Sequence, residues 1–366
     1  MFVEAAVVTR MGVAPIAPVG APTRRWLLAV VTVVLATLVA LLLAEGAVRL
    51  LHLAPPLPLQ YSSYAPSPWL TYGPKPDSRH EGLADTGEYR YDFRHNRFGL
   101  RDTEHAFAKP PGTFRILGLG DSFTYGVGAA FEETWLYRLE QALNARPGEH
   151  PPVEIIKAGV ARFFPAPERL LLENLGLRFQ PDLILVGFTP NDLIDTCLGL
   201  EAITVDESGF LMSREARQLG RVGLQLYLHS EFARLLLAKV LVSRSTRACL
   251  ATAGADRDNG YGRQPEWQQV EAEYTQIAAL AAGAGAQLGI VYIPERGPWG
   301  AEQDYQVQRL QDWADNHGAL FINALPAFRS HPDPAALHYP KDGHCTPAGY
   351  ALVADAVARA MTHSPQ

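Results

Sequence analysis

The chain has few cysteines and no excess of basic residues, and each shortage excludes a class of function. Three cysteines in 366 residues are too few for a disulfide scaffold, and none of them has the CxxC spacing of a structural zinc site. The formal net charge is -6 at pH 7, whereas nucleic-acid binding usually requires a basic surface. P-loop, HExxH and GxGxxG motifs are also missing. We therefore expect no nucleic-acid partner and no need for a metal or an organic cofactor.

One long hydrophobic run lies near the N-terminus. It extends from Trp26 to Ala44, and only Thr32 and Thr37 interrupt it. A helix of this length, at ~1.5 Å per residue, spans a hydrocarbon core of ~30 Å. Basic residues remain on the cytoplasmic side of a membrane, and Arg24-Arg25 directly precedes the run. We predict a single-pass protein with its N-terminus in the cytoplasm and the remainder in the periplasm or another extracytoplasmic space.

A cleaved signal peptide is the alternative interpretation, with Ala44-Glu45-Gly46 as the small-residue cleavage site. The apolar part of a signal peptide usually has ~7–15 residues, which is shorter than this run, so an uncleaved anchor is favoured. Both interpretations place the following domain outside the cytoplasm.

The rest of the chain divides by composition. Residues 1–23 are predicted to be a cytoplasmic tail and residues 24–53 the transmembrane anchor helix. Residues 54–112 are predicted to be an extended tether and N-terminal extension, because Pro, Ser and Tyr are dense up to about Pro76. Residues 113–362 are predicted to be the main domain, with an insertion at about 194–263 that carries its own helices within 224–242.

Strand and helix patterns alternate from residue 113 onwards, which predicts a parallel sheet covered by helices on both faces. The apolar runs predict strands at 114–119, 153–157, 183–188, 288–293 and 320–322. The helical spacings predict helices at 133–143, 165–179, 267–282, 305–317 and 347–361.

Three polar or glycine positions follow the first three strands. Ser122 lies in the turn after the first strand, Gly159 ends the second, and Asn191 follows the third. The carboxyl ends of parallel strands share one edge of the sheet, so we expect these residues to converge. Asp342-Gly343-His344 lies far downstream, just before the closing helix.

These residue types are those required for acyl transfer. A serine hydroxyl needs a base to remove its proton, and histidine is the usual base. Asp342 and His344 are spaced so that the carboxylate can reach the near ring nitrogen while the far nitrogen faces Ser122. A tetrahedral oxyanion also needs hydrogen-bond donors. The backbone N–H groups of Ser122 and Gly159 and the side-chain amide of Asn191 are the candidates.

Four sequence blocks in this order resemble the SGNH (GDSL) hydrolase superfamily over roughly Phe114 to Ala360. The blocks are Gly120-Asp121-Ser122, Gly159, Asn191-Asp192 and Asp342-Gly343-His344, the last followed by Thr346-Pro347-Ala348-Gly349-Tyr350. The resemblance implies that residues 113–362 are an SGNH-hydrolase-like domain, a flavodoxin-like three-layer α/β/α sandwich with Ser122, His344 and Asp342 as catalytic residues. Ser122, Gly159 and Asn191 would form the oxyanion hole. The Asn96–Asp102 segment and the single anchor are similar to those of membrane-tethered bacterial members.

The chain departs from the family pattern at three positions. Lys341 occupies the place of the acid in the common DxxH spacing, so the pair takes the shorter DxH form. Thr189 replaces the third-block glycine, and Lys157 stands where many relatives have asparagine. Purely structural roles are the alternatives for the site residues. Ser122 could cap a helix, Asn191 could be a turn residue, and Asp342 could be a solvated turn carboxylate.

We predict a serine-dependent ester hydrolase, an acyl or acetyl esterase that forms an acyl-enzyme on Ser122. Its location makes cell-envelope carbohydrate or lipid esters the expected substrates. An O-acyltransferase with the same site, and a non-catalytic envelope-binding or scaffold protein, remain alternatives. Cys197 and Cys249 could pair in an oxidising compartment, and Cys345 is expected to be an inert buried thiol. The sequence does not predict an oligomeric state.

Overall fold

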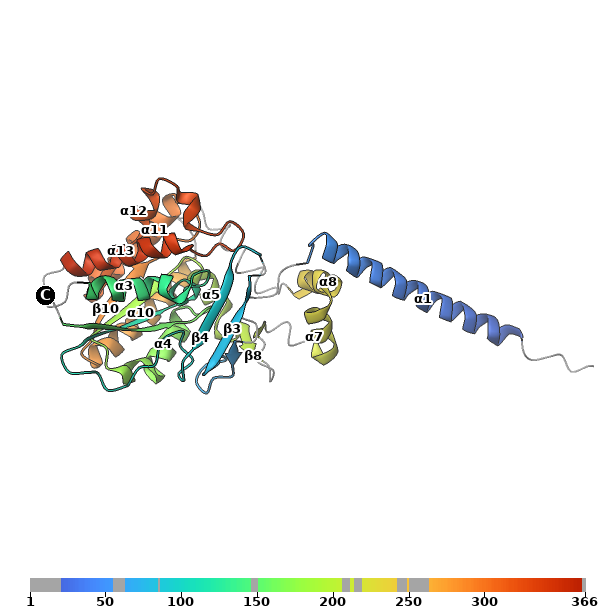
Figure 1. Cartoon of the computed structure of the whole chain (residues 1–366), viewed down its shortest axis with the longest axis horizontal. Helices are drawn as coiled ribbons and strands as arrows, with labels where there is room; N and C mark the ends of the chain where they lie inside the picture. The colour runs from blue at the N-terminus through green and yellow to red at the C-terminus, as the bar shows by residue number, and fades with distance from the viewer. Residues whose placement is uncertain are drawn as a thin grey trace, which may run out of the picture. The chain divides into compact units, whose positions relative to one another are not determined.

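The computed structural model describes residues 21–54, 63–84, 86–145, 151–205, 211–213, 219–241, 249 and 263–363. The chain divides into two compact units (Figure 1). One comprises residues 1–55 with 226–236, and the other comprises residues 56–225 with 237–366.

The first unit is built on one long helix, α1 (Ala21–Leu50). Its segment Arg25–Leu50 is long and apolar enough to cross a membrane, and its most apolar part is not buried against the rest of the protein. Thr32 and Thr37 donate their hydroxyl hydrogens to carbonyls one turn earlier, at 2.9 and 2.8 Å. The two polar interruptions of the hydrophobic run are therefore satisfied within the helix.

The helices predicted within 224–242 are α7 (Gly220–His229) and α8 (Glu231–Leu241). The break between them has a local cause at Ser230. Its hydroxyl oxygen accepts a hydrogen bond from the backbone N–H of Ala233 at 3.0 Å, which caps the start of α8.

The second unit contains the predicted parallel sheet. Its five strands lie in the order β11-β10-β7-β5-β6, and every neighbouring pair is parallel. Of these five strands, the first in sequence is flanked by the second and the third, which is the flavodoxin-like doubly wound order. The strands are β5 (Phe114–Gly120), β6 (Val153–Gly159), β7 (Leu183–Phe188), β10 (Gln287–Tyr292) and β11 (Leu320–Asn323).

Helices cover both faces of the sheet, because strand side chains alternate between two apolar clusters. One face packs against α4 (Pro165–Asn174), α10 (Gln264–Gly283) and α11 (Ala301–His317). The other packs against α3 (Trp135–Asn144), α12 (Leu325–Arg329) and α13 (Pro347–His363). Figure 1 shows α3 and α13 side by side. The predicted three-layer fold is confirmed.

The predicted helix over 165–179 ends earlier, at Asn174, and a short 3-10 helix follows at Gly176–Phe179. A side chain at Gly176 would lie 2.7 Å from a methyl carbon of Leu117. Position 176 therefore requires glycine, because the 3-10 helix passes close to β5 there.

The remaining elements are short. Three antiparallel hairpins pair β1 (Tyr64–Ala65) with β2 (Gly73–Pro74), β3 (Ser78–Leu83) with β4 (Arg90–His95), and β8 (Ile203–Val205) with β9 (Leu211–Ser213). Two short helices, α2 (Ser122–Tyr125) and α5 (Asp192–Leu198), follow β5 and β7. Single 3-10 turns lie at Phe131–Glu133, Leu200–Ala202 and Pro334–Leu337.

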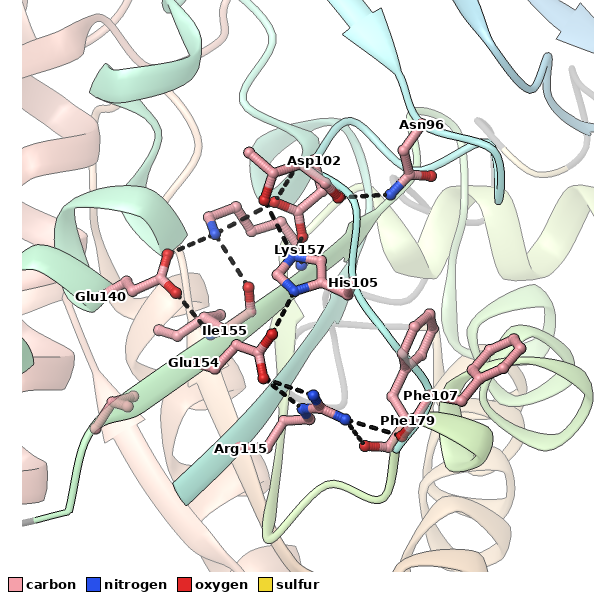
Figure 2. A network of polar contacts seen from close by, with 12 residues as sticks. Asn96, Asp102, His105, Phe107, Arg115, Glu140, Glu154, Ile155, Lys157 and Phe179 are labelled. Atoms are coloured by element: carbon pink, nitrogen blue, oxygen red, sulfur yellow. Dashed lines mark hydrogen bonds and ion pairs between the residues drawn. The ribbon is translucent and has the colours of Figure 1, made fainter. Parts of the chain in front are cut away.

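A buried polar network ties the segment after β4 to the edge of the sheet (Figure 2). The ring nitrogens of His105 contact Asp102 at 2.9 Å and Glu154 at 2.6 Å. Burial lowers the pKa of His105, but its bonds to these two carboxylates outweigh burial and raise it overall. Arg115, fully buried on β5, pairs with Glu154 at 2.6 Å.

Lys157 belongs to the same network. Its ammonium group contacts Glu140 at 2.7 Å and Asp102 at 3.4 Å, and its backbone N–H donates to Asp102 at 2.8 Å. The lysine that replaces the family asparagine is thus explained by these ion pairs with the N-terminal segment and α3 (Figure 2).

Candidate active site

The turn between β5 and α2 exposes Ser122. Gly120 has φ +147°, and a side chain there would lie 2.2 Å from the Thr124 hydroxyl, so the strand must end in glycine. Asp121 is the N-cap of α2, and its carboxylate accepts the backbone N–H of Phe123 at 2.8 Å. Ser122 is therefore the first helical residue and not the cap, which leaves its hydroxyl available for other contacts.

Ser122, His344 and Asp342 form a continuous hydrogen-bonded chain. The Nε2 atom of His344 lies 2.8 Å from the Ser122 hydroxyl oxygen, and its Nδ1 lies 2.5 Å from Oδ1 of Asp342. The serine and histidine are 222 residues apart in the sequence. The structure thus brings together the three residues that the sequence proposed as nucleophile, base and acid.

Asp342 is not a solvated turn residue, because its side chain is only 8% exposed. Burial raises the pKa of Asp342, but hydrogen bonds from His344 and the attraction of the imidazolium outweigh burial and lower it overall. The carboxylate is therefore ionised at neutral pH, as required of a group that holds a neighbouring imidazole in one tautomer.

Asn191 lies beside this chain, at the start of α5. Its side chain makes no capping hydrogen bond. Its amide nitrogen instead donates to Asp121 at 3.2 Å and to Asp195 at 3.4 Å. The Ser122 hydroxyl is 3.5 Å from the same Asp121 oxygen, so amide and hydroxyl share one neighbour.

Thr189 holds this arrangement together. Its hydroxyl contacts Asp121 at 2.8 Å and makes a short contact with the amide oxygen of Asn191. Burial raises the pKa of Asp121, although the hydrogen bonds that it accepts act in the opposite direction. The threonine that replaces the family glycine thus fixes both the residue before the serine and the candidate oxyanion donor.

Gly159 ends β6 directly opposite Gly120. A side chain at Gly159 would lie 2.4 Å from the carbonyl carbon of Thr124 and 2.4 Å from the backbone nitrogen of Tyr125. The glycine is therefore required for the close approach of α2 to β6, independently of any role as a hydrogen-bond donor.

The sequence analysis missed Glu295, which follows β10 at the same edge of the sheet. Burial, followed by repulsion from Asp121, raises the pKa of Glu295 to about 7, although a hydrogen bond from the backbone N–H of Asn191 acts in the opposite direction. Extending the strand-end argument to the fourth strand could have found it. The same argument could not have found Glu88 and Tyr89, which contact the Asp342 loop from the N-terminal extension.

The three cysteines take no part in the hydrogen-bonded chain of Ser122, His344 and Asp342. Cys345 is fully buried next to His338, and burial raises the pKa of its thiol well above the usual range. Cys197 and Cys249, whose pairing the sequence left open, form a disulfide. Among the described residues, no group of three or more His, Cys, Asp or Glu side chains could hold a metal ion.

The model of the GDSL-like lipase/acylhydrolase family matches residues 119–352, which is more than half of the chain. The chain belongs to this family. It is therefore a GDSL-type hydrolase that acts on ester bonds.

Solved structures with a similar fold include two that this GDSL hydrolase matches over most of their length. Axe2, an acetylxylan esterase from Geobacillus stearothermophilus, is 12% identical with a TM-score of 0.41, and the match covers 69% of this chain and 95% of that one. LAE5, an alpha/beta hydrolase enzyme from the metagenome of Lake Arreo, is 15% identical with a TM-score of 0.41, covering 69% and 97%. No curated protein sequence matches the chain.

Proposed function

We propose that this GDSL hydrolase is a serine esterase that works through an acyl-enzyme on Ser122. The observation that carries the proposal is the unbroken hydrogen-bonded chain from Ser122 through His344 to Asp342. In acylation, the serine oxygen attacks the ester carbonyl carbon and its proton passes to Nε2 of His344. The tetrahedral intermediate then expels the alcohol, which takes that proton.

Deacylation repeats these steps with water. His344 removes a proton from water, the hydroxide oxygen attacks the acyl carbon, and the acid leaves as Ser122 regains its proton. Asp342 keeps the Nδ1–H of the ring directed away from the serine throughout. The His344 side chain is 21% exposed, so water can reach the base.

We propose Asn191, with the backbone N–H groups of Ser122 and Gly159, as the oxyanion hole. The Asn191 amide and the Ser122 hydroxyl share Oδ2 of Asp121 as a neighbour, and the two hydrogen bonds of the amide to carboxylates are long, at 3.2 and 3.4 Å. Long bonds of this kind are weak, so a developing oxyanion can replace one of them. Removing one oxyanion donor from a serine hydrolase costs roughly 2.7–4 kcal/mol of transition-state stabilisation.

A fluorophosphonate probe, which modifies activated serines, tests the nucleophile. We expect the wild type and Ser330→Ala, a change at an exposed surface serine, to be labelled and to hydrolyse p-nitrophenyl acetate. Ser122→Ala should lose both activities while keeping the wild-type melting temperature. Labelling that persists in folded Ser122→Ala would refute the assignment. Absence of labelling in the folded wild type would instead favour the non-catalytic binding protein.

We further propose that α1 is retained as a membrane anchor with the esterase outside the cytoplasm, where cell-envelope carbohydrate or lipid esters are the substrates. The helix continues through the candidate cleavage motif at residues 44–46. Within that motif, the Glu45 carboxylate accepts the backbone N–H groups of Glu231 and Phe232 at 3.0 and 2.9 Å, and Val48, just beyond it, is buried. A continuous, packed helix at this position supports retention over cleavage.

The intact mass of the protein purified from membranes distinguishes the two fates of α1. Retention leaves the mass of the full chain, whereas cleavage after the motif at residues 44–46 removes about 46 residues. A reporter enzyme joined after Tyr61 tests the side of the membrane, and cytoplasmic activity of that fusion would refute the proposed location. Release of acetate from O-acetylated polysaccharide then tests the substrate class, and acetyl transfer to an added sugar would favour the transferase.

A further inference from the structure

Glu88, in the loop between β3 and β4, binds the backbone of the loop that carries Asp342. One carboxylate oxygen of Glu88 accepts the N–H of Lys341 at 2.9 Å, and the other accepts the N–H of Asp342 at 2.8 Å. The two partners are 253 and 254 residues from Glu88 in the sequence. Two charge-assisted bonds to consecutive amides fix both the position and the orientation of the peptide that carries Asp342.

The next residue, Tyr89, contacts the carboxylate of Asp342 itself. Its hydroxyl donates to Oδ2 at 3.1 Å, while Oδ1 faces His344. The tyrosine is buried, and its ring lies 4.7 Å from that of Tyr339 on the acid's own loop. Burial, followed by repulsion from Asp342, raises the pKa of Tyr89 above its ordinary value, so its hydroxyl remains a donor at every working pH.

The same extension also supports the segment that follows the nucleophile. His95, at the end of β4, contacts the Tyr125 hydroxyl at 2.8 Å, and Arg101 donates to the carbonyls of Gly126 and Ala129, both at 2.7 Å. Arg101 is 6% exposed, so these bonds lie in a dry environment where they are strong. Residues 88–101 therefore contact the site at two places. Tyr89 contacts the Asp342 carboxylate directly, and His95 and Arg101 contact the segment that follows Ser122.

We propose that Glu88 and Tyr89 are positioning residues of the esterase, which hold Asp342 at the distance and angle that orient His344. This inference rests on the proposed function, because it concerns the same Ser122–His344–Asp342 chain. Lys341 occupies the common position of the acid, so the DxH spacing leaves a tight turn around Gly343, with φ +88° and a bond from its N–H to the Tyr339 carbonyl. Glu88 and Tyr89 supply side-chain support to that turn from outside the final loop.

Kinetics of Tyr89→Phe test the proposal, with Tyr91→Phe on the same hairpin as the matched control. The change removes one hydroxyl and keeps the ring. We expect kcat for p-nitrophenyl acetate to fall about tenfold with KM unchanged, since one lost orienting bond of ~1.4 kcal/mol corresponds to that factor. The acid limb of the pH profile should move to higher pH, because a carboxylate with one donor fewer holds a proton more tightly. Tyr91→Phe should behave as the wild type.

A double-mutant cycle separates positioning from general stability. In an Asp342→Asn background, Tyr89→Phe should have no further effect on kcat, because the Asp342 carboxylate that Tyr89 positions is no longer present. Glu88→Gln, which loses the charge and one acceptor, should also lower kcat without changing KM. If both single variants stay within twofold of the wild type with an unchanged acid limb, or if Tyr89→Phe remains fully additive with Asp342→Asn, the proposal is wrong.

Failure of this inference and failure of the proposed function give different results. Activity and fluorophosphonate labelling that survive in Ser122→Ala would refute the serine mechanism itself. Loss of activity in Ser122→Ala together with unaffected Tyr89→Phe and Glu88→Gln would refute only the positioning role. All variants are made in the full-length chain, and their melting temperatures report on folding.

Discussion

Replacing Glu295 with glutamine should stabilise the protein at neutral and alkaline pH and leave it unchanged in acid. Glu295 lies at the edge of the sheet that carries Ser122, where burial and the nearby Asp121 raise its pKa to about 7 from its ordinary value of 4.5. An acid whose pKa is raised by folding binds its proton more tightly in the native state. Stability is therefore greatest below pH 4.5 and falls as the pH rises towards 7.

The structure limits the size of this effect. A shift from 4.5 to about 7, at 1.36 kcal/mol per pKa unit, corresponds to at most about 3 kcal/mol of lost stability above pH 7. Glutamine removes the charge but keeps an oxygen that can accept the backbone N–H of Asn191. The variant should therefore gain most of that energy without losing the contact that holds the oxyanion donor.

Urea unfolding at pH 4, 6 and 8 measures the difference directly. We expect the free energy of unfolding of Glu295→Gln to equal that of the wild type at pH 4 and to exceed it by up to about 3 kcal/mol at pH 8. Glu302→Gln, at an exposed position on α11, is the matched control and should show no such trend. A difference for Glu295→Gln that does not grow with pH would show that the carboxylate is already ionised at low pH and would refute the reasoning.

Three other changes have expected outcomes. Gly159→Ala should abolish fluorophosphonate labelling, because its methyl group would collide with the backbone of α2 at 2.4 Å, and labelling at the wild-type rate would contradict that contact. His105→Gln should lower the melting temperature at pH 6 and have less effect at pH 9, because the stability from a raised histidine pKa is complete below pH ~6.5 and is lost as the pH rises through the native value. Cys197→Ser should destabilise the protein by roughly 4 kcal/mol in the chain-entropy limit, because the disulfide closes a loop with a sequence separation of 52. A reducing agent should lower the melting temperature of the wild type but not that of the variant.

The parallel sheet could be predicted from the sequence because each of its strands is a short apolar run bounded by turn residues. The convergence of Ser122 and Asn191 followed from topology, since consecutive parallel strands end on one side. His344 is a candidate base from its residue type and its spacing to Asp342, and the family resemblance strengthens that assignment, because nothing local connects it to a serine 222 residues away.

Glu88 and Tyr89 could not be found in this way. The alternation of charged and aromatic residues over 88–93 indicates a strand with one buried face, but it does not indicate which residues cover that face. The partners of Glu88 and Tyr89 are about 253 residues distant. These contacts form because the β3–β4 hairpin packs against a loop of the main domain. The hydrophobic periodicity of the sequence does not encode that packing. Lys157 shows the same limitation, since its charge is explained only when Glu140 and Asp102 are seen beside it.

The contacts of the N-terminal extension also bear on where the catalytic unit begins. A chain that started at residue 113 would keep every strand of the sheet and all of the four family blocks. It would nevertheless leave the buried Lys157 without its Asp102 contacts, the Tyr125 hydroxyl without His95, and Asp342 without Tyr89. Buried polar groups that lose their partners cost about 1–3 kcal/mol each. We therefore propose that the hairpin β3–β4 and the segment to His105 belong to the catalytic unit, because they complete the hydrogen bonds on which the site's geometry depends.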